Sequence, residues 1–130
     1  MSYEVGVLCQ APEQMSPAAA LSWLLEQLPG PAEQHELSTW ETAASCWQKM
    51  ASDGREFGVA VNMANPTVFD FAQQAWAEGV APSPELYNAV VIFTLIDDVW
   101  EPVDLLLRLV IDQWNGLLFD EVSGFRATLN

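Results

Sequence analysis

The chain has 130 residues, 51% of them hydrophobic, and carries 18 Asp and Glu against 4 Lys and Arg, a formal net charge of −14. This length predicts a single domain over residues 1–130 with its own core, and the apolar fraction excludes a disordered acidic tail. Nucleic acids and anionic membranes bind clustered cations, so the charge balance excludes both as partners.

The first two predicted elements are a strand over residues 3–9 and a helix that begins after Ser16. The strand is predicted by apolar residues at every second position: Tyr3, Val5, Val7 and Cys9. Ser16 followed by proline is typical of a helix start. The buried face of this helix is predicted by four leucines at helical spacing: Leu21, Leu24, Leu25 and Leu28.

Residues 32–37 are polar and predict a connector, followed by a second helix that ends at Asp53-Gly54. Ser38 and Glu41 have the spacing of a capping box, in which each side chain accepts a backbone N–H at the helix start. Apolar residues then follow at helical spacing: Trp40, Ala43, Ala44, Trp47 and Met50. We therefore expect Trp40 and Trp47 on a buried helix face.

A second strand over residues 57–63 is predicted by alternating apolar residues. Asn65-Pro66 then begins a third helix, and Gly79 lies at its C-terminal end. The residues expected on the buried face of this helix are Phe69, Ala72 and Trp76.

The C-terminal half opens with an ambiguous segment. Ser83-Pro84-Glu85 looks like a helix start, but the β-branched and aromatic residues that follow favour a central strand over residues 88–96. A fourth helix over about residues 101–114 and a strand over residues 117–121 come next. Residues 125–129 could add a last strand after the turn at Ser123-Gly124. The sequence thus predicts an α+β single domain, with a four- to five-stranded mixed sheet packed by about four helices.

No catalytic or nucleotide-binding motif of the forms G-x-S-x-G, G-x-x-x-x-G-K-[ST] or G-x-G-x-x-G occurs in the chain. The sole histidine, His35, falls in the polar connector, where we expect it to be solvated. Cys9 and Cys46 with one histidine are too few for structural zinc, so we expect buried thiols and neither metal nor cofactor. We expect no enzyme activity.

The N-terminal residues Met-Ser-Tyr-Glu-Val include no basic residue, so we expect no secretory signal and a cytoplasmic location. No run of apolar residues is long enough to cross a membrane.

The densest acidic group surrounds Trp100, between the strand over residues 88–96 and the last helix. Three readings are open: acids that complement the helix dipole, a Mg²⁺ or Ca²⁺ site without EF-hand spacing, or a patch that binds a basic partner. A large aromatic ring among charges is typical of protein interfaces, which favours the third. The predicted partner-binding residues are Asp97, Asp98, Trp100, Glu101 and Asp104.

Two stretches resemble small acidic immunity proteins of bacterial polymorphic toxin systems. The opening MSYEVGVL resembles their first strand, and residues 90–124 resemble their closing strand, helix and strand. In that unit Gly116-Leu117-Leu118-Phe119-Asp120 fits the pattern, whereas Glu121-Val122 stands where those families usually have Pro-Gln. The resemblance covers about a third of the chain.

The resemblance implies an α+β protein that binds a cognate toxin of a contact-dependent or type VI secretion system and blocks it. The alternative is an acidic secretion chaperone for an effector protein, although those chaperones usually open with a helix. An enzyme ranks last, because no acid–base or nucleophile set can be assembled. The partner is expected to be a toxin or effector protein, and a homodimer is left open.

Overall fold

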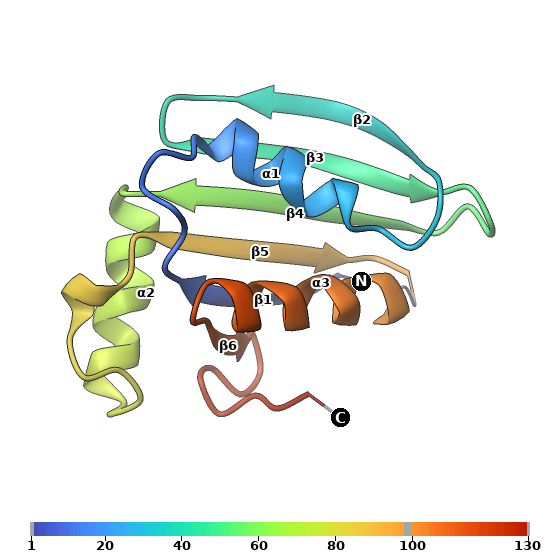
Figure 1. Cartoon of the computed structure of the whole chain (residues 1–130). Coiled ribbons are helices and arrows are strands. Elements are labelled where there is room, and N and C mark those ends of the chain that lie inside the picture. The colour runs from blue at the N-terminus through green and yellow to red at the C-terminus, as the bar shows by residue number, and fades with distance from the viewer. Residues whose placement is uncertain (1, 98–99, 130) are drawn as a thin grey trace.

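One sheet with helices on both faces forms the molecule (Figure 1), described for residues 2–97 and 100–129 in a computed structural model. Across these residues six strands lie in the order β2-β3-β4-β5-β1-β6. The strands are β1 (Tyr3–Cys9), β2 (Ala32–Thr39), β3 (Ala43–Met50), β4 (Glu56–Met63), β5 (Ala89–Leu95) and β6 (Leu117–Asp120). The helices are α1 (Pro17–Glu26), α2 (Pro66–Ala77) and α3 (Trp100–Gln113), with a 3₁₀ turn, η1 (Pro84–Leu86).

The α+β class is confirmed, but the details of the sheet differ from the prediction. Every pair of neighbouring strands is antiparallel, so the expectation of a mixed sheet is wrong. The counts of four to five strands and about four helices are also wrong for the described residues. One cause is the pair of strands β2 and β3, which occupy a segment where we expected a connector and a helix.

The predicted helix that begins at Ser38 is instead the hairpin of β2 and β3. Buried residues of β3 alternate with less buried ones, as in a strand with one covered face. Gln48 hides this alternation in the sequence because it is polar yet only 3% exposed; its amide donates to Cys46 Sγ at 3.5 Å. Trp40 lies at the hairpin turn, where its N–H donates to the Ala43 carbonyl, and its side chain is 61% exposed. It is therefore not a core residue.

The polar connector predicted for residues 32–37 is the edge strand β2. Its outer edge has no neighbouring strand in the sheet order, and its burial pattern is mostly exposed. An edge strand needs few apolar residues, which is why the apolar pattern gave no sign of it. The optional strand over residues 125–129 is also absent, although Gly124 forms an isolated bridge with Asp120.

The remaining elements were predicted within a few residues. The ambiguous segment is a strand, β5, and only Pro84–Leu86 of its apparent helix start forms a 3₁₀ turn. Two helix starts are confirmed in atomic detail. Ser16 Oγ accepts the Ala19 N–H at 3.1 Å, and Asn65 Oδ1 accepts the Val68 N–H at 3.2 Å.

Neighbouring residues of the central strands belong to two different hydrophobic clusters, one on each face of the sheet. Val7 of β1 packs in the cluster that contains α1 and α3, whereas Leu8 packs in the cluster that contains α2. Successive strand residues point to opposite faces, so α1 and α3 cover one face and α2 covers part of the other. Figure 1 shows α2 at one end of the sheet. Each fully buried Val, Leu or Phe contributes about 1.5–3 kcal/mol to this arrangement.

Close packing at β1 requires a residue without a side chain. A Cβ atom added to Gly6 would lie 2.5 Å from the Val91 carbonyl oxygen and 2.6 Å from Phe119 Cζ. Phe119 is itself stacked on Phe71 of α2, with ring centroids 4.3 Å apart. Gly6 therefore lets the aromatic layer under α2 lie directly against the sheet.

We expect Gly6→Ala to lower the free energy of unfolding by about 2–3 kcal/mol, because the added methyl group overpacks a site bounded by backbone. Urea denaturation measures this change. Gly30→Ala is the matched control: a Cβ there has nothing within 4 Å, so its effect should stay within about 0.5 kcal/mol. Equal effects of the two substitutions would contradict this account of the packing.

Candidate protein-binding surface

The structure brings together three of the five predicted binding residues at the start of α3. Trp100 is 42% exposed, and its ring packs against Tyr3 of β1 with ring centroids 5.6 Å apart. A surface hollow of about 390 Å³ is lined by Trp100, Glu101, Asp104, Thr128 and Leu129. Three of the predicted residues thus share one hollow between α3 and the C-terminal segment.

Of the two remaining predicted residues, the structure describes only Asp97. Asp97 lies outside the lining of the hollow, and its Oδ2 accepts the backbone N–H of Glu56, the first residue of β4, at 3.2 Å. Asp98 lies outside the described residues. Asp104 accepts Arg108 Nε at 2.8 Å, one helical turn along α3. Such an exposed pair stabilises a helix by about 0.3–0.5 kcal/mol and reduces the charge offered to a partner.

Tyr3 packs against the ring of Trp100 and is therefore part of this surface. The sequence predicted it only as a strand residue. Burial raises the pKa of Tyr3 to about 12, together with the hydrogen bond that its hydroxyl donates to Asp120. For Asp120, burial alone would raise the pKa, but the Tyr3 hydroxyl and the N–H groups of Ser123 and Val122 outweigh it and hold the pKa below its usual range. Tyr3 therefore contacts both Trp100, through its ring, and Asp120 at the end of β6, through its hydroxyl.

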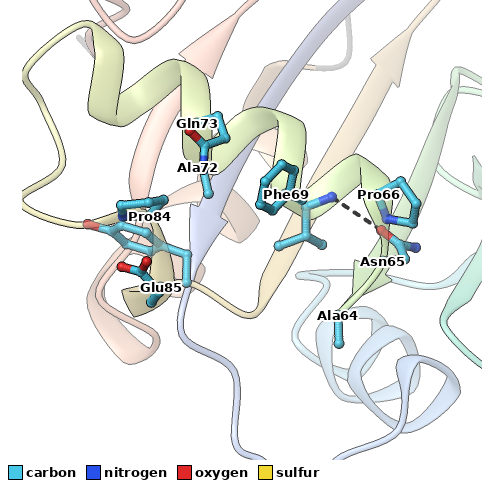
Figure 2. A pocket seen from close by; sticks show the side chains of 10 residues that line it. Ala64, Asn65, Pro66, Phe69, Ala72, Gln73, Pro84 and Glu85 are labelled. Atoms are coloured by element: carbon cyan, nitrogen blue, oxygen red, sulfur yellow. Dashed lines mark hydrogen bonds between the residues drawn. The ribbon is translucent and has the colours of Figure 1, made fainter.

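A groove along α2 is a second surface, which the sequence reasoning did not identify. It has a volume of about 520 Å³ and lies between α2 and the segment that contains η1. Figure 2 shows Asn65 and Pro66 at one end, Pro84 and Glu85 at the other, and the ring of Phe69 between them. The lining is mainly apolar and also includes Ala72 and Tyr87.

The apolar face of α2 was assigned wrongly in part. Val68, Ala72 and Ala75 are the buried residues of the helix, whereas Phe69 is 62% exposed and Trp76 is 53% exposed. The small residues, three or four positions apart, let the helix lie close to the sheet. Both large rings consequently face solvent. The sequence signal for the buried face was the spacing of the small residues Ala72 and Ala75.

The surroundings of the groove are acidic. Glu85 lines it, Asp70 follows Phe69 on α2, and Glu78 caps the C-terminal end of the helix. The sequence from residue 56 to residue 107 contains no Lys or Arg. The lining of this apolar groove therefore carries one carboxylate and no cationic side chain.

Groups that could carry other chemistry have ordinary structural partners. His35 lies on β2 rather than in a connector, and its Nε2 is 2.9 Å from Glu56 Oε1. Both cysteines are free and buried, and burial raises the pKa of the Cys9 thiol to about 12. Across residues 2–97 and 100–129, no three His, Cys, Asp or Glu side chains gather closely enough to hold a metal ion.

Among the same residues, no helix combines the length and the apolar character needed to cross a membrane.

Comparison of the chain with protein-family models, with curated proteins and with solved structures found no match. The surfaces described above are therefore the basis on which function has to be argued.

We expect Tyr3→Phe to raise the pKa of Asp120, because the substitution removes a donor to its carboxylate. A carboxyl group with a lowered pKa stabilises the fold above its unfolded-state value of about 3.9, and this contribution is lost as the pH falls through the folded-state value. The variant should therefore lose part of the pH dependence of unfolding below about pH 4. Carbon NMR titration of Asp120 and urea denaturation measure both effects. Tyr87→Phe, at the other tyrosine, should leave the titration of Asp120 unchanged; a similar shift in both variants would disprove the contact.

Proposed function

We propose that this chain is a non-catalytic protein that binds and neutralises a basic bacterial toxin by covering its active surface. The observation that carries the proposal is the presence of exposed aromatic side chains on a surface with a large excess of carboxylates. The resemblance of residues 1–8 and 90–124 to immunity proteins supports the same reading.

The charge favours a basic partner because the chain cannot neutralise itself. The formal net charge is −14, and two of the four cations already bind acids of their own neighbourhood: Arg55 to Asp53 and Arg108 to Asp104, both at 2.8 Å. A field of one sign accelerates association with an oppositely charged protein, up to about 10⁸–10⁹ M⁻¹s⁻¹ at low salt. Fast association is what a cell needs against a toxin that it makes itself.

The exposed rings supply anchors for such a complex. Trp100 is 42% exposed and already held on one side by Tyr3, so little side-chain freedom remains to be lost when a partner covers it. Tryptophan is among the residues most enriched at the energetic centres of interfaces. We therefore assign the hollow at Trp100, Glu101 and Asp104 to the interface with the toxin.

A second candidate function is favoured by the groove along α2. Acidic secretion chaperones bind effector proteins through apolar grooves, and such a chaperone keeps its partner unfolded. An immunity protein binds its toxin in the folded, active state. Hydrogen exchange on the bound partner distinguishes the two functions, since protection across the whole partner supports neutralisation and loss of protection supports a chaperone.

We expect Trp100→Ala to weaken binding of the proposed cognate toxin by about 30-fold, equivalent to about 2 kcal/mol. Surface plasmon resonance measures the affinity, and the association rate should fall steeply as salt rises from low to physiological concentration. The matched control is Trp40→Ala, because Trp40 is 61% exposed at the β2–β3 turn. Co-expression of the unchanged chain should restore growth of cells that make the toxin.

Failure to bind the toxin or to restore growth would overturn the proposed function. Equal affinities of the Trp100→Ala and Trp40→Ala variants would instead remove Trp100 from the interface. An association rate that does not change with salt would exclude electrostatic steering.

A further inference from the structure

We propose that the groove between α2 and η1 is a docking site for a basic amphipathic segment of a protein partner. The apolar side chains of that segment enter the groove, and its Lys or Arg side chains face the carboxylates of Glu85 at the groove and Asp70 on α2. The inference rests on the proposed function, because it names the chemistry by which the partner is recognised. It concerns a surface separate from the hollow at Trp100.

Large apolar side chains are exposed on both elements that border the groove. Phe69 on α2 is 62% exposed, and Leu86 on η1 is 46% exposed. Between the two elements lies a groove of about 520 Å³, within the range of about 300–1,000 Å³ that ligand sites occupy. A groove of this size accepts a few apolar side chains from one face of a helix, the mode in which amphipathic helices bind.

One end of the groove is held in place by hydrogen bonds. Asn65 accepts the Val68 N–H, and its amide donates to Asn62 Oδ1 at 3.0 Å and to the Thr42 carbonyl at 3.2 Å. These bonds connect the start of α2 to Thr42 in the β2–β3 turn and to Asn62 near the end of β4. A surface that is already ordered loses less conformational entropy on binding.

Charge decides which kind of segment fits. Glu85 lines the groove and Asp70 lies on α2, whereas the Glu78 carboxylate accepts Gln74 Nε2 at 2.8 Å and lies near Gly124, outside the groove. The whole sequence from residue 56 to residue 107 carries eight acids and no Lys or Arg. A basic segment is attracted to this surface, and an acidic segment is repelled by it.

The same charge argues against two other occupants. A second copy of the chain would bring another net charge of −14 to the interface and place carboxylates opposite carboxylates. An anionic membrane surface would be repelled for the same reason. A basic protein segment is the occupant that agrees with both the apolar lining and the charge.

The test uses a fluorescein-labelled peptide of Leu and Lys, with leucines at positions i, i+3, i+4 and i+7. Fluorescence anisotropy should detect its binding to the full chain, and NMR shift mapping should locate the peptide at α2 and η1. Phe69→Ala should weaken binding at least about tenfold, and Trp40→Ala should not. Glu85→Gln should weaken binding and reduce its salt dependence, and Glu26→Gln on α1 is the matched charge control. A peptide with Glu in place of Lys should not bind.

Circular dichroism and thermal melting check that each variant is folded, which the exposure of Phe69 favours. Binding that maps to another surface, or that Phe69→Ala leaves unchanged, would overturn the inference. So would binding of zwitterionic vesicles that Phe69→Ala abolishes, because the groove would then be a membrane site.

The same variants separate this inference from the proposed function. If the toxin binds the Phe69→Ala variant as tightly as the unchanged chain, the docking inference is wrong although neutralisation stands. If the Leu/Lys peptide occupies the groove while the toxin fails to bind, the groove is a site for basic segments and the proposed function is wrong.

Discussion

Strand β5 is the element on which the rest of the fold depends. It pairs residue by residue with β4 on one side and with β1 on the other, from Ala89 to Leu95. It therefore joins the β2-β3-β4 meander to the pair formed by β1 and β6. Its alternate residues also serve both hydrophobic clusters, since Val91 packs toward α1 and α3 and Val90 packs toward α2. A strand that is covered on both faces has to be almost entirely apolar, as this one is.

The surface combines two properties that usually oppose each other. Exposed rings such as Phe69 and Trp76 favour self-association, because burying apolar surface in a contact removes it from water. The excess of carboxylates opposes it, because every encounter between two copies brings like charges together. Like-charge repulsion thus allows large rings to stay uncovered without driving copies of the chain together.

The sequence predicted elements whose signals are local. The starts of α1 and α2 were found because Ser16 and Asn65 each precede a proline, and both caps form as expected. The sequence-based prediction was wrong where a tertiary contact determines burial. Gln48 is a polar residue that is buried and bonded to the Cys46 thiol, so the alternation typical of a strand was not visible in β3, which was predicted to be a helix. At the candidate site, Trp100 was found from its acidic neighbours, whereas Phe69 was assigned to the core. The buried face of α2 is the one whose small residues let it lie close to the sheet, and Ala72 and Ala75 were the local sign of that face.

The pairing of β1 has a consequence for how the protein is made. Its two neighbours in the sheet, β5 and β6, come late in the chain: Cys9 pairs with Ala89, and Val5 pairs with Asp120. During synthesis β1 therefore has to remain unpaired until these later strands have left the ribosome. Meanwhile the β2-β3-β4 meander can form from contacts between neighbouring segments, which close faster than distant ones. Throughout this interval the acidic side chains keep the nascent chain apart from its copies on the same messenger RNA.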